Sequence, residues 1–509
     1  VLLEVLVLAV CSYADPVEEW ITFSSFSATV YDMVIDSCGN VYLAGSGILS
    51  ERLGYDFATA KYDTNGNEQW VKTYDGGNGE DRAKALVMDS QGNIYVTGSS
   101  ASANEDDNIV TIKYSNDGVR QWVRRHDINV NGDYPIGICI DSSDNIYVAG
   151  TTLNYDNYLN TIITIKYDDN GDTQWINECD YGSRFYDIAS DRYGNVHVTG
   201  ECSAGFATVK YDTDGEEEWT SCTEEGSIPY GGIALDSSGN VYVSGRDSGD
   251  YITVKIDSAG TEQWVVQYDY DGYNDWPQAI VADSMGNIFI TGYGFEDIGY
   301  DIWPVYLTVM YNSDGDMVWQ RNHTYYMDWS KAYDLCLDEE SNVYVTGRDY
   351  SPYDNGWGYT TIKYSIAGDQ EWLIHTDDTG APTNIALDAQ NNVYVTGEAL
   401  NETLWATVKY NQQLGIDPSH SEGNVSLQLS PVYPNPNCGS FNIYFSTPTS
   451  TFANIRIYDI TGKLVSSVSR REYSSGSHEL QFDGVVPGIY ICRIDSEPAS
   501  VSRSFVVID

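Results

Sequence analysis

Short apolar runs and polar turns alternate along this chain on a repeating plan. A ten-residue segment that begins Asp-x-x-Gly-Asn in five copies and Asp-x-x-x-Asn in the other three, and ends in alternating apolar residues and a glycine, occurs eight times, 45 to 55 residues apart. The copies begin at Asp36, Asp89, Asp141, Asp191, Asp236, Asp283, Asp338 and Asp388. A second segment ending in a turn and a Trp follows each of the first seven copies, and in five of them it begins with Lys-Tyr. Self-similarity at this period predicts a repeat architecture in which each unit is a propeller blade of four short strands.

Each strand of the blade has its own pattern. Strand a is an apolar run before the repeated Asp, such as 86–88, and we expect it to be buried on both faces. The Asp-x-x-Gly-Asn turn leads to strand b, and strand c carries a Thr at one fixed place in all eight units. An Asn-Gly or Asp-Gly type of turn then leads to strand d, which carries a Trp.

The number of blades follows from how the ring closes. Seven units have their own strand-d Trp, while the eighth loses the pattern after strand c, at about residue 411. Glu18-Glu19-Trp20, ahead of the first strand a, supplies the missing strand. Pairing of this N-terminal strand with the last blade would cover both open edges. The sequence therefore predicts an all-β, eight-bladed propeller over residues 15–411.

The repeat resembles the β-propeller repeat often called SBBP, over roughly residues 16–411, although that family's name presumes seven blades. The Trp strand after a polar turn is also similar to the tryptophan-docked repeat of quinoprotein dehydrogenases, which are eight-bladed. Both resemblances imply the fold, and neither implies a function.

The two ends of the chain have different compositions from the repeats. Residues 1–14 contain an apolar stretch and then Ser12-Tyr13-Ala14, typical of a secretory signal peptide cleaved after Ala14. No basic region precedes this stretch, so we expect the precursor to begin upstream. Residues 412–430 are interpreted as a linker, and the alternating segments of 431–509 predict a small β-sandwich. No later segment has the ~20 apolar residues of a membrane helix.

The C-terminal region resembles the sorting domain of the type IX secretion system. The matching residues are Tyr433, Pro434, Asn435 and Pro436, and the Gly-x-Tyr-x-x-Arg pattern of Gly488, Tyr490 and Arg493. The resemblance implies export through that machinery, to the surroundings or the outer surface of a Gram-negative-type bacterium. A plain immunoglobulin-like adhesion or spacer module is the alternative.

The net charge of −49, from 75 acidic and 26 basic residues, bears on the partners. A surface this acidic repels phosphate backbones, so we expect no nucleic-acid partner. The partners that remain are a glycan or an extracellular protein, besides the secretion machinery, and we expect a monomer.

The sequence offers no motif for catalysis. The eight repeated Asp residues sit where Asp caps a tight turn, and an eightfold repeat is typical of a scaffold because a catalytic site is asymmetric. No metalloprotease helix motif, nucleophile elbow, phosphate-binding loop or haem motif is present. We therefore assign no catalytic or metal-binding residues and expect no cofactor, with calcium left open. Eight cysteines follow the signal region, and their pairing cannot be deduced from the sequence.

The connections between strands b and c and between d and a vary in length and share one face of the ring. They are rich in aromatic residues around blades 6 and 7, which suits a recognition surface. The candidate ligand-binding residues are Trp276, Tyr300, Trp303, Trp329, Tyr353 and Trp357. We expect a binding or scaffold protein; the alternatives are an extracellular enzyme acting on polysaccharide, or a quinone-dependent dehydrogenase.

Overall fold

The protein is represented by a computed structural model. It describes residues 16–48, 54–77, 79–101, 107–128, 132–153, 160–179, 182–202, 205–223, 227–297, 299, 301–324, 329–351, 356–377, 379–399, 404–412, 428–429, 440–447, 451–459, 463–473, 476–483, 488–496 and 500–507. The proposed signal peptide, most of the proposed linker and the Tyr433–Pro436 motif lie outside these residues. The chain divides into two compact units, Asp15–Gln413 and a second unit that contains Leu414–Asp509.

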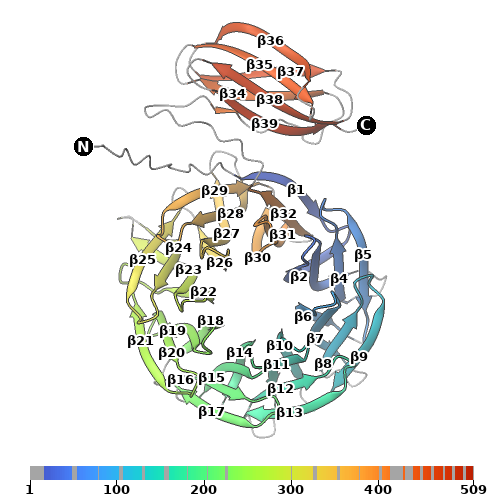
Figure 1. The fold of residues 1–509 in the computed structure, drawn as a ribbon, viewed down its shortest axis with the longest axis vertical. Coiled ribbons are helices and arrows are strands. Elements are labelled where there is room, and N and C mark those ends of the chain that lie inside the picture. Colours follow the sequence, from blue (N-terminus) through green and yellow to red (C-terminus); the bar gives the residue numbers. More distant parts are fainter. Residues whose placement is uncertain are drawn as a thin grey trace, which may run out of the picture. The chain divides into compact units, whose positions relative to one another are not determined.

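The first unit is a ring of eight four-stranded antiparallel sheets in its described residues, which confirms the predicted fold class (Figure 1). Blade 1 consists of β2 (Ser27–Ile35), β3 (Val41–Ile48), β4 (Asp56–Tyr62) and β5 (Glu68–Tyr74), and blade 2 of β6 (Asp81–Met88), β7 (Ile94–Ala101), β8 (Asp107–Tyr114) and β9 (Arg120–His126). Blade 3 consists of β10 (Asp133–Ile140), β11 (Ile146–Thr152), β12 (Thr161–Tyr167) and β13 (Thr173–Cys179), and blade 4 of β14 (Gly182–Ser190), β15 (Val196–Cys202), β16 (Gly205–Tyr211) and β17 (Glu217–Cys222). Blade 5 consists of β18 (Ile228–Leu235), β19 (Val241–Asp247), β20 (Asp250–Ile256) and β21 (Glu262–Tyr268), and blade 6 of β22 (Trp276–Ala282), β23 (Ile288–Asp297), β24 (Ile302–Tyr311) and β25 (Met317–His323). Blade 7 consists of β26 (Lys331–Leu337), β27 (Val343–Ser351), β28 (Gly356–Tyr364) and β29 (Gln370–Thr376), and blade 8 of β30 (Thr379–Leu387), β31 (Val393–Ala399), β32 (Trp405–Asn411) and β1 (Val17–Phe23). The first strand of each blade, strand a, lies nearest the centre of the ring (Figure 1).

The N-terminal strand closes the ring, as predicted. β1 pairs antiparallel with β32, and Trp20 lies opposite Lys409 in that pairing. The sheet order β1-β32-β31-β30 places this strand at the outer edge of blade 8. The edge of β32 that would otherwise offer unpaired backbone groups is therefore covered.

Burial along the blade differs from the expectation for strand a. Strand b is the strand whose residues are nearly all buried, as in β7 and β11. In strand a of blade 2, Leu86 is buried while Val87 and Met88 are only half-buried. The prediction of burial on both faces was wrong, because strand a is the inner end of the blade and has neighbours on fewer sides.

The strand-d tryptophans connect neighbouring blades. The indole N–H of Trp20 donates to the carbonyl of Thr64, in the c–d turn of blade 1, over 2.9 Å. The same bond recurs around the ring, from Trp70 to Asn116, Trp122 to Asp169, Trp175 to Thr213, Trp219 to Ser258, Trp264 to Ser313 and Trp319 to Ile366. A Cβ on Gly66, whose φ is +78°, would lie 2.8 Å from the Trp20 ring. Glycine is therefore required there by both its backbone conformation and the close approach of the indole.

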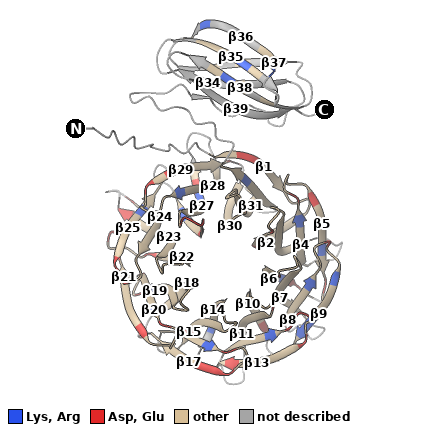
Figure 2. Ribbon diagram, in the orientation of Figure 1, with Lys and Arg blue, Asp and Glu red and all other residues tan. Residues whose placement is uncertain are grey.

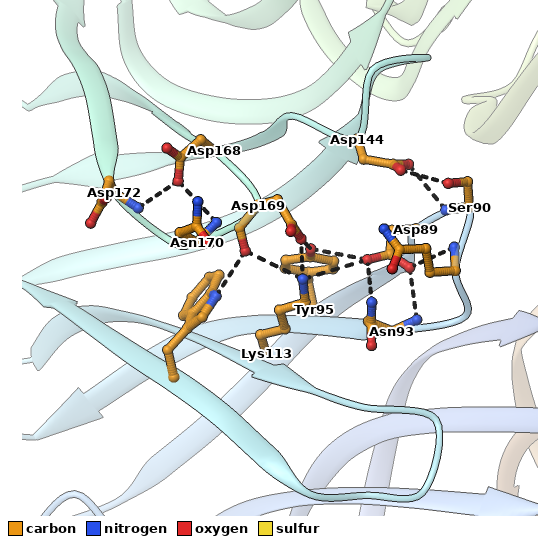
Figure 3. A network of polar contacts seen from close by, with 12 residues as sticks. Asp89, Ser90, Asn93, Tyr95, Lys113, Asp144, Asp168, Asp169, Asn170 and Asp172 are labelled. Atoms are coloured by element: carbon orange, nitrogen blue, oxygen red, sulfur yellow. Dashed lines mark hydrogen bonds and ion pairs between the residues drawn. The ribbon is translucent and has the colours of Figure 1, made fainter.

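The repeated Asp caps its turn, which accounts for its eight copies (Figure 3). Oδ1 of Asp89 accepts the backbone N–H of Gln91 and of Asn93, at 3.0 and 2.8 Å. The Tyr95 hydroxyl bridges Asp89 and Asp169, at 3.1 and 2.9 Å, and the Lys113 ammonium contacts Asp169 as well. Asp169 belongs to the next blade, so this network holds two blades together rather than forming a reaction site.

Three further carboxylates connect the inner strands. Asp32, Asp187 and Asp334 each follow a β-bulge in strand a. Their Oδ2 atoms accept a backbone N–H from strand a of the next blade, donated by Leu86, Ile233 and Ile385 over 2.8 to 2.9 Å. Burial raises the pKa of Asp32 and of Asp187 to about 6 and that of Asp334 to about 7, against the lowering effect of these N–H groups. Blades 2 and 6 carry alanine at this position, Ala85 and Ala279.

We expect these raised pKa values to make the propeller less stable as the pH rises from about 4 to above 7. A carboxyl group that ionises more readily in the unfolded chain (pKa near 3.9) than in the fold contributes stability only while the folded form keeps its proton. The variant Asp334→Ala, which introduces the residue of blades 2 and 6, should lose less stability than the wild type between pH 5 and pH 8. Urea unfolding at both pH values measures the difference, expected at about 1–3 kcal/mol. An unchanged difference would contradict the raised pKa of Asp334.

The second unit contains two antiparallel sheets. One sheet has the order β33-β34-β37, and the other β36-β35-β38-β39. Their strands are β33 (Gln428–Leu429), β34 (Ser440–Thr447), β35 (Thr451–Asp459), β36 (Leu464–Tyr473), β37 (Gly476–Asp483), β38 (Gly488–Ser496) and β39 (Ser500–Val507). The rings of Phe445 and Tyr473, one from each sheet, lie edge to face with centroids 4.9 Å apart. No helix among the described residues of the chain is long and apolar enough to cross a membrane.

Candidate functional site

The face of the ring that carries the b–c and d–a connections holds the predicted ligand-binding residues. Strand a begins and strand b ends at this face, because a d–a connection enters strand a and a b–c connection leaves strand b. We call it the loop face. Of the predicted residues, Tyr300 and Tyr353 lie outside the described part of the chain.

The predicted tryptophans have different surroundings. Trp329 is 53% exposed. Trp303 and Trp357 are half-buried, on β24 and β28, and no ring contact joins these two in the described structure. Trp357 packs edge-on against Tyr350, with ring centroids 5.5 Å apart. A single patch centred on the three tryptophans stays a prediction.

Trp276 instead belongs to a row of rings that crosses three blades. Its ring lies 5.5 Å from that of Tyr230 in blade 5 and is stacked on that of Tyr293, with centroids 6.2 Å apart and planes inclined by 15°. Tyr230 in turn contacts Tyr186 of blade 4 at 5.7 Å. All four are half-buried, and they lie on the innermost two strands of their blades.

Cationic side chains lie over these rings. Arg246 lies 3.8 Å from the centroid of Trp276 and Lys331 lies 4.2 Å from that of Tyr293. Arg184 lies over Tyr186 at 5.3 Å, and Arg348 lies over Trp357 at 4.1 Å. We call the four rings of the row, with Trp357 and these four cations, the loop-face cluster. Its members are Arg184, Tyr186, Tyr230, Arg246, Trp276, Tyr293, Lys331, Arg348 and Trp357.

The cations of the cluster are unusual in so acidic a protein. Acidic residues outnumber basic ones 75 to 26, and outer strands such as β1, β13 and β17 carry acidic segments (Figure 2). Even so, within the described residues no carboxylate oxygen lies within 4.0 Å of the side-chain nitrogens of Arg184, Arg246, Lys331 or Arg348. Burial, and then the neighbouring Arg348, lowers the pKa of Lys331. The rings hold these cations in place without neutralising them.

A hollow of 360 Å³ lies on the same face between blades 2 and 3. Its lining includes Arg82 and Lys84 of β6 and Tyr134 of β10. Lys84 lies 3.9 Å from the ring centroid of Tyr31 in blade 1, and Arg82 is paired with Glu80. The pairing of a cation with an aromatic ring therefore recurs on the opposite part of the loop face.

Among the described residues, Ser330, Asp349 and His323 form a Ser-Asp-His group whose order is wrong for nucleophilic catalysis. Oδ1 of Asp349 accepts from the Ser330 hydroxyl over 2.6 Å, and Oδ2 lies 3.0 Å from Nε2 of His323. The carboxylate stands between the hydroxyl and the imidazole, whereas activation of a serine needs the imidazole beside the hydroxyl. This buried group connects blades 6 and 7.

Among the described cysteines, those with free thiols include Cys38, Cys139, Cys202, Cys222, Cys336 and Cys492. Burial raises the pKa of the Cys139 and Cys336 thiols well above the usual range. Thiols with raised pKa values are poor nucleophiles near neutral pH. These two residues of strand a are therefore structural.

Sequence reasoning missed most of the loop-face cluster because it searched the connections. Arg246, Tyr293 and Arg348 each follow the glycine that ends the repeated strand-b segment. That position varies among the eight copies while the glycine before it repeats, and this variation is the signal that could have identified it.

The second unit presents the predicted sorting motif on β38. Tyr490 is buried, while Arg493 is exposed on the other side of the strand. Residues 431–508 match the family described as the secretion system C-terminal sorting domain. The protein is secreted. It is a type IX secretion substrate that reaches the cell surface or the surroundings, which confirms the predicted localisation.

The propeller resembles solved structures only at low sequence identity. No curated protein matches the sequence. The virginiamycin B lyase of Staphylococcus aureus aligns with 10% identity and a TM-score of 0.40, over 76% of this chain and 98% of that one. The WD40 propeller domain of Doa1 aligns with 10% identity and a TM-score of 0.41, over 79% and 98%. PorZ, a surface component of the type IX secretion system of Porphyromonas gingivalis, aligns with 10% identity and a TM-score of 0.31, over 94% and 81%. Alignments this loose bear on neither ligand nor activity.

Proposed function

We propose that this secreted propeller is a non-catalytic binding protein for glycans that carry isolated acidic sugars, and that the loop-face cluster is its binding surface. The observation that supports the proposal most is the set of four cations held over aromatic rings with no carboxylate partner among the described residues. We also propose that the blades belong to the SBBP repeat type, supported by the eight copies of the Asp-x-x-x-Asn segment, five of which carry glycine at the fourth place.

A carboxylated sugar matches both components of the cluster. A guanidinium group can bind a carboxylate through two parallel hydrogen bonds, and such charge-assisted bonds are stronger than neutral ones. An aromatic ring offers an apolar face to the C–H groups of a pyranose. Arg246 with Trp276, and Arg348 with Trp357, place a cation and a ring at one position.

The overall charge limits how many charges the ligand carries. At −49 the protein repels a dense polyanion at long range. At physiological salt the reach of those charges is about 8 Å, so within the cluster the nearby cations prevail. A chain with one carboxylate every few sugars avoids most of the repulsion and keeps the local attraction.

Binding of the full chain to matched oligosaccharides tests this function. The series consists of a neutral oligosaccharide, its uronic-acid counterpart and a densely sulfated chain of equal length. We expect the uronic-acid form to bind at least about tenfold more tightly than the neutral form, since one charge-assisted contact is worth about 1.5–3 kcal/mol. The affinity should fall as salt rises. Equal affinity for the neutral and acidic forms, or binding of none of the three, would contradict the proposal.

A further inference from the structure

Two groups of three carboxylates occupy equivalent places in the propeller. Asp250, Asp269 and Asp275 lie between blades 5 and 6, and Asp56, Asp75 and Asp81 lie between blades 1 and 2. In each group one carboxylate begins strand c, one follows strand d, and one stands at the start of the next strand a. Within a group, one oxygen of each carboxylate lies within 4.8 Å of the corresponding oxygens of the other two.

The third member of each group is buried and incompletely hydrogen-bonded. Asp275 is 0% exposed and Asp81 is 1% exposed. Their Oδ2 atoms accept the backbone N–H of Tyr270 and of Gly76, both over 2.7 Å. Their Oδ1 atoms are buried and make no hydrogen bond of good geometry within the described residues. Burial raises the pKa of Asp81, while the nearby Ser100 hydroxyl and Arg125 act against the rise. An unpartnered carboxylate oxygen in such a place is costly unless something else, such as a metal ion, satisfies it.

The electrostatics of the blade 5 group favour a bound cation. Burial, and then the charges of Asp250 and Asp269, raises the pKa of Asp275 to about 7, while its N–H partner and Arg246 act against the rise. Arg246 is the cation that acts on this group, and it lies over the Trp276 ring rather than in an ion pair with any of the three. In the described part of the chain, these three carboxylates therefore converge without a cationic side chain between them.

The other blades show that the junction does not need three converging carboxylates. Between blades 4 and 5, Thr223 and Ser227 close the same place with a hydroxyl–hydroxyl bond of 2.8 Å. Between blades 6 and 7, the equivalent of Asp275 is Ser330, whose hydroxyl donates to Asp349. Neutral side chains thus close the junction between blades 4 and 5. Between blades 2 and 3, Asp133 takes the place of Asp275, and its Oδ2 accepts the backbone N–H of Ile128 over 2.7 Å, but no group of three converging carboxylates forms there among the described residues. The convergence of three carboxylates at the other two junctions is therefore in excess of what the scaffold needs.

We infer that each carboxylate group binds one divalent cation, and that calcium is the cation. All six donors are oxygens, with no histidine or cysteine among them, which favours a hard cation over zinc. Asp75 and Asp269 are exposed, so water can complete the six to eight ligands that calcium takes. Each ion would clamp the end of one blade to the first strand of the next. This inference does not depend on the proposed glycan binding.

Calorimetric titration of the full chain with calcium chloride, after removal of metal by a chelator, tests the inference. We expect two sites, with dissociation constants of about 10⁻⁴–10⁻³ M, as in other extracellular modules, and a Tm that rises with calcium. The variant Asp269→Asn should lose the blade 5 site, Asp75→Asn the blade 1 site, and the double variant both, together with the rise in Tm. These exposed positions are chosen because substitution there should not disturb folding.

Glu262→Gln is the matched control, because it removes the same charge from an exposed position on β21. It should keep both sites. If the wild type binds no calcium up to about 10 mM, well above the expected range, the inference is wrong. It is equally wrong if the double variant binds calcium as the wild type does, or if Glu262→Gln weakens binding as much as Asp269→Asn.

Discussion

Replacing Trp20 with alanine is expected to destabilise the propeller by about 3 kcal/mol, the lower end of the cost of removing a packed tryptophan. The residue lies in the strand that closes the ring. Its ring packs against the core of blade 8 and blade 1, 6.1 Å from the Tyr394 ring, and its indole N–H donates to Thr64. The substitution therefore removes packing contacts to blades 8 and 1 and the hydrogen bond that joins the last blade to the first.

Thermal and denaturant unfolding of Trp20→Ala beside Trp329→Ala measure this effect. Trp329 is 53% exposed, so its replacement should change the stability by no more than about 0.5 kcal/mol. Deletion of residues 15–26 removes β1 and exposes the edge of β32, and light scattering should then detect association. Equal stability of the two tryptophan variants, together with a monomeric deletion variant, would show that β1 does not hold the ring closed.

The fold could be predicted from the sequence because each blade repeats the same local rules. Asp at the start of the a–b turn, Thr in strand c and Trp in strand d each answer a physical need that recurs eight times, such as the turn cap of Asp89 or the indole bond of Trp122. Closure was also predictable, since the pattern that is missing at residue 411 is present at Trp20. Because the same residues recur in each blade, the sequence pattern alone predicts the fold.

The candidate site was harder to predict from the sequence than the fold, because its residues do not repeat. Tyr230 and Trp276 come together only because neighbouring blades place their inner strands side by side. A β-bulge in strand a, between Ile228 and Gly232 in blade 5 and between Pro277 and Ala279 in blade 6, shifts the register of the loop-face end of the strand against the rest of it. No local pattern of polar and apolar residues predicts such a bulge.

The carboxylate groups were missed for a related reason. Asp250, Asp269 and Asp275 are spread over 26 positions and two blades, and none belongs to the repeated Asp-x-x-Gly-Asn turn. A search for metal sites looks for ligands at short fixed spacings. In this protein the spacing of the three carboxylates along the sequence is set by the strands and turns that separate them within and between blades.

Replacing both Arg246 and Arg348 with glutamine is expected to weaken binding of a uronic-acid oligosaccharide by about 100-fold or more. Each arginine would contribute one charge-assisted contact, and two such contacts together are worth about 3–6 kcal/mol. Glutamine keeps hydrogen-bond donors but not the positive charge, so affinity for the neutral oligosaccharide should change much less. Arg120→Gln, on the exposed end of β9, is the control for loss of a positive charge elsewhere.

The triple replacement of Trp303, Trp329 and Trp357 by alanine separates charge from stacking. Trp357 holds Arg348 and Trp329 lies 5.3 Å from Lys331, so the rings position the cations. We expect the triple variant to lose binding of both the acidic and the neutral oligosaccharide while its Tm stays near that of the wild type. A large fall in Tm would show instead that these rings belong to the core. If binding survives the triple replacement but not the loss of the two arginines, the cations act without the loop tryptophans, and the row from Tyr186 to Tyr293 is the surface on which the sugar lies.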